Sequence, residues 1–291
     1  MDAIGERLEA LLGRCDPAER RQRDPVDFVH QYHEPADQEV AGLIAASLAF
    51  GNAQAARRSA QRVLDALGPR PAHVVAEAGE DELFDRIRGF THRIYRDEHM
   101  SRLLARAGQL LDAHGSLGVA FRGYYEQSRG DFREAMACLA DALRGETRTR
   151  AMKHLVSDPR AGSACKRLVL YARWMIRPSD GVDLGLWPID PSVLLMPVDT
   201  HVHRISLNLG LTSRRTASWV TAEEITSALR RYDPTDPVKY DFALCHLGVS
   251  RECPSRPVHD KCARCVLQDV CRVWGDDPRG GSAKEAGQLR L

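Results

Sequence analysis

Apolar residues in this chain recur mainly at intervals of three and four positions, which is the spacing of one face of an α-helix. Runs of this kind, separated by glycine and proline signals, predict helices over residues 1–15, 72–77, 82–87, 98–113, 117–127 and 132–143. No segment shows the alternation of a convincing strand, and no internal repeat is present. The sequence therefore predicts an all-α protein built from short helices and short connections.

Two of the predicted helices are apolar nearly all round. One runs from Val40 to Ala49 and the other from Val169 to Ile176. Helices without a polar face are buried in the middle of a domain. Phe50-Gly51-Asn52 interrupts the first run, and a further helix follows until Gly68-Pro69. Capping patterns predict later helices that start at Thr221 and at Pro237.

The composition is that of an ordinary globular protein. The chain has 291 residues, of which 43% are hydrophobic and 28% charged, enough for one large domain or two lobes. No apolar run approaches membrane-spanning length, and the first fifteen residues lack the features of a signal peptide. Eight cysteines without a secretory signal indicate a reducing compartment, so we expect a cytoplasmic protein. The polar stretch 275–291 is predicted to be disordered.

Charge is nearly balanced over the whole chain but uneven locally. The formal net charge is +1, whereas residues 148–177 carry eight basic residues and a single acid, Asp158. Such an excess could hold a phosphate backbone. The alternative is a solvated helix face whose charge is offset by acids from residues 77–85. Within this stretch a turn at Gly162-Ser163-Ala164 leads into a buried helix, whose free backbone amides would bind phosphate.

Asp199 lies between an apolar segment and a helix that is expected to end at Gly210. The positive end of a helix stabilises a carboxylate, and the simplest interpretation of Asp199 is an N-cap. His203 follows one turn later and is placed to hydrogen-bond to Asp199. His201 and His203 are two positions apart and therefore point in different directions on a helix, so we do not expect them to share a metal ion.

Four cysteines lie within nineteen residues near the C-terminus, at Cys253, Cys262, Cys265 and Cys271. Two thiolates three positions apart can reach one inorganic centre, and the outer pair can complete the ligand set. Either an iron–sulfur cluster or a structural zinc ion satisfies this spacing, and disulfides are disfavoured in a reducing compartment. The remaining cysteines are expected to be small buried apolar residues: Cys15, Cys138, Cys165 and Cys245.

The turn at Gly162, the Val198-Asp199-Thr200-His201 motif and the cysteines together resemble the helix-hairpin-helix DNA glycosylase superfamily, in particular its endonuclease III branch. The resemblance covers residues 36–274. It implies two helical lobes, residues 36–177 and residues 1–35 with 178–274, which face each other across a DNA groove. Gly162 stands alone where the family hairpin has two glycines, and the first cysteine spacing is two residues longer than in endonuclease III.

The resemblance also implies a set of site residues and partners. Asp199 matches the catalytic aspartate, and Lys166 falls where lyase-competent members place their lysine. The implied cofactor is a [4Fe-4S] cluster, with zinc as the alternative, and the implied partner is double-stranded DNA with a damaged base, bound by a monomer near the nucleoid. The implied DNA contacts are Gly162, Ser163, Ala164, Arg167, His201 and Asn52, the last where the family carries a wedging glutamine.

The chemistry of base excision agrees with these roles. A damaged nucleotide is flipped out of the duplex, a carboxylate offsets the positive charge on the sugar as the base leaves, and an amine attacks C1′. Two hypotheses follow: a DNA glycosylase with abasic-site lyase activity, or a non-catalytic iron–sulfur protein that binds nucleic acid on the same scaffold. In the second, Lys166 contacts phosphate only.

Overall fold

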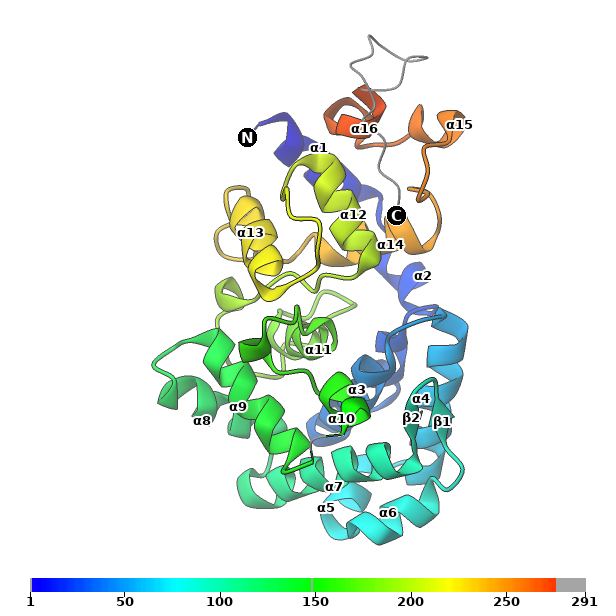
Figure 1. Cartoon of the computed structure of the whole chain (residues 1–291), viewed down its shortest axis with the longest axis vertical. Helices are drawn as coiled ribbons and strands as arrows, with labels where there is room; N and C mark the ends of the chain where they lie inside the picture. Colours follow the sequence, from blue (N-terminus) through cyan, green and yellow to red (C-terminus); the bar gives the residue numbers. More distant parts are fainter. Residues whose placement is uncertain (1, 148, 276–291) are drawn as a thin grey trace.

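The computed structural model describes residues 2–147 and 149–275 and is built almost entirely from helices (Figure 1). The predicted all-α class is confirmed. The predicted absence of strands is wrong in one place, where β1 (Thr91–His92) pairs with β2 (Tyr95–Arg96) in an antiparallel hairpin. Strands of two residues are too short to show an alternating pattern. Beyond Gly275, the tail predicted to be disordered lies outside the described residues.

The first part of the chain to α11 contains most of the helices. They are α1 (Ala3–Arg14), α2 (Pro17–Arg21), η1 (Pro25–Gln31), α3 (Pro35–Leu48), α4 (Ala53–Leu67), α5 (Pro71–Glu77), α6 (Glu80–Arg86), α7 (Asp97–His114), α8 (Leu117–Gln127), α9 (Phe132–Arg144), α10 (Arg150–Leu155), η2 (Pro159–Ala161) and α11 (Lys166–Ile176). A long connection then leads to η3 (Pro191–Val193), α12 (Thr200–Leu209), α13 (Trp219–Arg230), α14 (Asp241–Val249), α15 (His259–Cys262), η4 (Gln268–Val270) and α16 (Arg272–Gly275).

Two predicted helix starts are wrong. Helix α13 begins before Thr221, because the hydroxyl of Ser218 accepts the Thr221 amide and is the N-cap. The Thr221 hydroxyl donates instead to the carbonyl of Thr216 at 2.6 Å. Helix α14 begins at Asp241, four residues after the predicted start at Pro237. In both cases the sequence offered several residues that favour a helix start, and tertiary contacts select among them.

The larger of two hydrophobic clusters is organised around α3, whose residues from Glu39 to Leu48 are all buried. Helix α11 crosses α3 closely at Gly42. A Cβ atom at position 42 would lie 2.7 Å from Met175 Cε and 3.2 Å from Tyr171 Cε2, so a larger residue here would require the Met175 and Tyr171 side chains to shift. Each large aliphatic side chain buried here contributes about 1.5–3 kcal/mol. These two helices are the apolar runs identified in the sequence.

One carboxylate is buried inside this cluster without a cationic partner. Glu39 is 2% exposed and accepts four hydrogen bonds through its two oxygens. The donors are the Ser116 hydroxyl (2.7 Å), the Leu117 amide (2.9 Å), the Gly118 amide (2.9 Å) and Trp187 Nε1 (2.8 Å). The first three belong to the start of α8, where the free amides of a helix favour an anion. Glu39 therefore links α3, α8 and the connection that follows α11.

The smaller hydrophobic cluster joins α1, α12, α13 and α14 to the cysteine segment, defined here as residues 253–271. Figure 1 shows α1, α12 and α13 toward one end of the molecule and α5 to α7 toward the other. Val26 and Trp187 pack in the larger cluster although they lie outside the predicted first lobe, residues 36–177. The division into lobes of residues 36–177 and of residues 1–35 with 178–274 stays a prediction. Ala164 belongs to the smaller cluster and Cys165 to the larger. The predicted phosphate-binding turn therefore stands at the junction of the two.

A buried ion network also joins the two clusters. Arg173 of α11 is 2% exposed and donates to the Asp183 carboxylate at 3.0 Å and to the Asp241 carboxylate of α14. The Asp183 carboxylate also accepts a hydrogen bond from Arg177. Breaking such a buried pair is strongly destabilising because it leaves a charge without a partner. Among the described residues, none of the helices has the length and hydropathy of a membrane-spanning segment.

Candidate functional site

Lys166 is the first residue of α11 and is half-buried. The chain reaches it through Gly162, with φ +80°, and Cys165, with φ +45°. The left-handed conformation is sparsely populated for a residue with a side chain, and such strain persists only where surrounding contacts impose it. The Lys166 Nζ atom donates to the Ala49 carbonyl at 3.0 Å. The ammonium group is thus held against the end of α3.

Asp199 is the N-cap of α12, as the simplest interpretation of the sequence predicted. Its Oδ1 atom accepts the amides of His201 at 2.8 Å and Val202 at 2.7 Å. Its Oδ2 atom takes no part in the cap and lies 3.6 Å from the Cys245 thiol of α14, which donates to it. One oxygen therefore fixes the carboxylate in place, and the other faces the interior of the site.

Cys245 contacts Asp199 and lies close enough to Lys166 to be affected by its charge. Burial raises the pKa of the Cys245 thiol well above its usual value. The negative charges of Asp199 and Asp241 raise this pKa further, and the positive charge of Lys166 lowers it. Since these charges act on the same thiol, the starts of α11 and α12 approach one place on α14. The sequence predicted Cys245 only as a small apolar residue.

Asp241 is a second carboxylate of this site, which the sequence analysis missed. It lies one helical turn before Cys245 and is 2% exposed. Its Oδ2 atom accepts a hydrogen bond from Arg173, whereas its Oδ1 atom has no hydrogen-bond partner among the described residues. Burial raises the pKa of Asp241 to about 6, against the opposing charges of Arg173 and Lys166. Its spacing of four residues from Cys245 places both side chains on one face of the helix, and this spacing could have indicated Asp241 from the sequence.

Asp24 is the third carboxylate near Lys166. Its Oδ2 atom lies 3.1 Å from His246 Nε2. Burial raises the pKa of Asp24, but the hydrogen bond and charge of His246, together with Lys166, outweigh burial and lower it overall. The Asp24-Pro25 pair marks a helix start in the sequence, and Asp24 does cap η1. Its second contact is with His246, 222 residues later, so no local sequence pattern indicates it.

The two histidines of α12 serve different contacts. His203 Nε2 lies 2.8 Å from the Arg214 carbonyl, so the hydrogen bond expected between its side chain and Asp199 is not formed. His201 packs against Gly248 of α14, where a Cβ atom would lie 2.5 Å from His201 Cβ. This close approach keeps the first turn of α12, and with it Asp199, against α14.

The predicted phosphate-binding turn keeps one of its amides available. The amide of Gly162 is not free as expected, because it donates to the Pro159 carbonyl at 3.0 Å. The Ser163 amide has no partner within residues 2–147 and 149–275, whereas Ala164 is buried beside the antiparallel bridge between Ser163 and Ser218. The Gly162 carbonyl accepts the amide of Trp219 at 3.0 Å, which ties the turn to the start of α13.

Two other predicted DNA contacts have roles within the fold. The Arg167 guanidinium donates to the Tyr95 hydroxyl and the His154 carbonyl and lies 4.9 Å from the centre of the Phe50 ring. It therefore braces α11 against the β-hairpin. Asn52 is exposed and caps α4, since its Oδ1 atom accepts the Ala55 amide at 3.0 Å. Asn52 lies three residues after Ala49, whose carbonyl accepts the hydrogen bond from Lys166.

Ile94 is a surface residue that the sequence analysis did not single out. It is 47% exposed at the turn between β1 and β2, and Arg93 and Arg96 flank it. The backbone of Arg93 is left-handed, with φ +55°, which produces the tight turn. In the sequence, the tetrapeptide Arg-Ile-Tyr-Arg is the pattern that could have indicated this exposed residue.

The cysteine segment brings its thiols near one another. Burial raises the pKa of Cys265, and the other three cysteines raise it further. Arg204 of α12 donates to the Cys253 sulfur at 3.1 Å, and a positive donor of this kind stabilises a thiolate ligand. In the described part of the chain no three acidic, histidine or cysteine side chains are already arranged to hold a metal ion. The donor set itself, four cysteines without disulfides, suits an iron–sulfur cluster or zinc.

Comparison with known proteins gives one match. A family model described as "Protein of unknown function (DUF2400)" covers residues 24–250. This span includes Asp24, Lys166, Asp199, Asp241 and Cys245 and ends before the cysteine segment. No curated protein and no solved structure matches the chain.

Proposed function

The chain belongs to the DUF2400 family, of unknown function, and we propose that it is a DNA glycosylase with abasic-site lyase activity on a helix-hairpin-helix scaffold. One observation carries this proposal. An amine at the start of α11 and a carboxylate oxygen at the start of α12 act on the same thiol, Cys245. The two residues are 33 positions apart in sequence and stand at the starts of helices that pack in different hydrophobic clusters.

The geometry supports a division of labour between Asp199 and Lys166. When the glycosidic bond breaks, the base leaves with the bonding electron pair and the sugar becomes positively charged at C1′. The Oδ2 atom of Asp199 is free to offset that charge, because Oδ1 alone holds the helix cap. The unprotonated Lys166 amine then donates its electron pair to C1′, which leads to a Schiff base once the ring oxygen departs as a hydroxyl.

Lys166 must lose a proton and release the Ala49 carbonyl before it attacks. Two carboxylates lie near enough for the lysine charge to act on them, Asp241 and Asp24. With a pKa of about 6, Asp241 can accept a proton near neutral pH and return it. We assign Asp241 as a proton-holding residue next to the pair, and Asp24 as a neutralising charge held by His246.

The surface around this site suits a DNA duplex. The open amide of Ser163, at the turn before α11, favours a backbone phosphate. Ile94, between two arginines, is of the kind that enters a base step and bends the duplex, which assists extrusion of a nucleotide. A [4Fe-4S] cluster, or zinc, would be held by Cys253, Cys262, Cys265 and Cys271. There it would supply structure, because Arg204 connects that segment to the helix that Asp199 caps.

Borohydride trapping tests this function. Labelled duplexes with an abasic site, 8-oxoguanine, thymine glycol, uracil or an alkylated purine are incubated with the full chain and reduced. We expect a covalent adduct on at least one duplex and none with Lys166→Gln. Asp199→Asn should lower base release at least about 100-fold, while folding persists because asparagine also caps helices well.

The rival function, a non-catalytic nucleic-acid-binding protein, also has a specific observation in its favour. Both candidate catalytic groups have structural roles, since Lys166 binds the Ala49 carbonyl and Asp199 caps α12. Under this alternative, the wild type and Asp199→Asn bind duplexes equally, Lys166→Gln binds less tightly because it loses a phosphate contact, and none of the three releases a base. If Asp199→Asn instead loses binding and stability together, the carboxylate serves the cap alone.

A further inference from the structure

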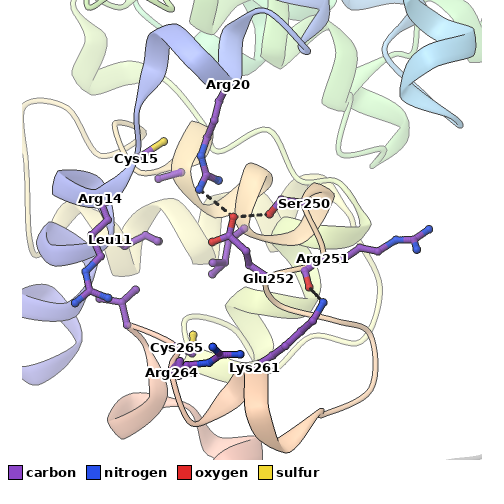
Figure 2. Close-up of a pocket in the computed structure, with 13 residues that line it drawn as sticks. Leu11, Arg14, Cys15, Arg20, Ser250, Arg251, Glu252, Lys261, Arg264 and Cys265 are labelled. Atoms are coloured by element: carbon purple, nitrogen blue, oxygen red, sulfur yellow. Dashed lines mark hydrogen bonds and ion pairs between the residues drawn. The ribbon is translucent and has the colours of Figure 1, made fainter.

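A pocket lies beside the cysteine segment (Figure 2); Lys166, Asp199, Asp241 and Cys245 are not among its lining residues, whereas Cys265 of the cysteine segment is. It is formed by the end of α1, by α2, by α14 with the residues after it, and by the cysteine segment. Its volume is about 290 Å³. This is close to the lower limit for small-ligand pockets and sufficient for one large apolar side chain.

The interior of this pocket is aliphatic. Leu11, Ala243, Leu247 and Val266 line it and are all buried. No aromatic side chain is among the lining residues. Nucleobases in single-stranded sites are usually held by stacking on aromatic rings, so the interior does not suit a base. It suits an apolar side chain that is removed from water on binding.

The remaining walls are strongly cationic. The lining residues include five basic side chains and one acid, Glu252. Glu252 is already engaged, since its Oε1 atom accepts Arg20 at 3.0 Å and the Ser250 hydroxyl at 2.8 Å, as Figure 2 shows. No carboxylate within the described ranges lies within ion-pair distance of the other four: Arg14, Arg251, Lys261 and Arg264.

We propose that this pocket binds an acidic peptide segment of a partner protein. An apolar residue of the peptide would enter the aliphatic interior, and neighbouring carboxylates would pair with the arginines and Lys261. A phosphodiester backbone would use the cations but leave the apolar interior empty. The chain as a whole is nearly neutral, so the positive charge here is a local feature. The inference is independent of the proposed glycosylase activity.

Fluorescence anisotropy tests the proposal on the full chain. The probe is a fluorescein-labelled peptide of three aspartates followed by a C-terminal phenylalanine. We expect saturable binding that weakens about tenfold in Arg14→Glu and in Arg264→Glu. Arg215→Glu is the matched control, because Arg215 is exposed, has no ion pair among the described residues and lies outside the pocket. Arg14 is on α1, so its variant remains informative if Arg264→Glu disturbs the cysteine segment.

Changes in the peptide separate the possible ligands. Replacing its phenylalanine by serine should weaken binding about tenfold, and replacing its aspartates by asparagines should abolish it. If serine has no effect while inorganic phosphate or a duplex competes with the peptide, the pocket is a phosphate site and the proposal is wrong. Absence of binding at millimolar peptide also overturns it. Borohydride trapping should be unchanged in Arg14→Glu, so failure of either proposal is recognised separately.

Discussion

The two hydrophobic clusters reach stability in different ways. The larger cluster centres on α3, which is buried almost throughout, and contains its own carboxylate, Glu39, held by hydrogen bonds alone. The smaller cluster relies on amphipathic helices, such as α1 and α12, and on a cysteine segment with only short helical turns. Packing of the chain alone can account for the first region, whereas the second includes the four cysteines that we propose hold an inorganic group. The candidate site takes Lys166 from a helix of the former and Asp199 from the start of a helix of the latter.

The largest expected effect comes from breaking the link between the clusters. Arg173→Met leaves Asp183 and Asp241 buried without their shared cation, and should lower the free energy of unfolding by about 3–5 kcal/mol. Urea denaturation measures this. A second variant, Arg173→Met with Asp241→Leu, should recover part of the loss. A loss below about 1 kcal/mol would show that the clusters are not coupled through Arg173.

A change inside the larger cluster should act on that cluster first. Glu39→Ala leaves the donors of Ser116, Leu117 and Trp187 without an acceptor, at a cost of about 3 kcal/mol, while the Gly118 amide keeps the Ser116 hydroxyl. Glu39→Gln retains one acceptor oxygen and should cost less. Hydrogen exchange should show weaker protection in α3 and α8, and equal loss throughout α12 and α14 would contradict the distinction between clusters.

The converse experiment addresses the cysteine segment. If this segment holds a cluster or zinc, Cys262→Ser should remove the inorganic group and lower stability by about 2 kcal/mol or more. Protection from hydrogen exchange should fall in α1, α12 and α14 while α3 and α7 are unaffected. Cys138→Ser, in α9, is the control. Visible absorbance and metal analysis of the wild type distinguish iron–sulfur from zinc, and protein without either would refute the cofactor assignment.

Asp241 should make the stability of the junction depend on pH. Its pKa in the folded chain, about 6, is above the ordinary value of 3.8. Between these values the folded protein holds a proton that the unfolded chain releases, so this contribution to stability is present below pH 4 and lost as pH rises to 6. Relative to Asp241→Asn, the wild type should therefore become less stable from pH 4 to 7. Parallel stability curves in urea would contradict this.

The smallest effect on stability is expected at the basic hairpin. Ile94→Ser changes an exposed side chain and should alter the free energy of unfolding by no more than about 0.5 kcal/mol. If Ile94 enters the duplex, base release or duplex binding should nevertheless fall about tenfold. Val119→Ser is the control, since Val119 on α8 is also an exposed aliphatic residue (56%), and it should change neither property.

Local sequence patterns predicted most of the helices but not which side chains meet where the helices contact one another. Buried α3 and α11 follow from apolar runs, and Asp199, Lys166 and the cysteines are visible as short motifs. Asp241 and Asp24 become part of the site only through Arg173, His246 and Lys166, which are distant in sequence. Likewise, Arg167 has the composition of a DNA contact, but its nearest partners are the Tyr95 hydroxyl and the His154 carbonyl.

The boundary between Ala164 and Cys165 has a mechanical consequence. These neighbours belong to different hydrophobic clusters, and Gly162 is tied to α13. The chain therefore passes from one cluster to the other across a single peptide, immediately before Lys166. Any substitution that shifts one cluster against the other would act directly on the backbone that positions this lysine.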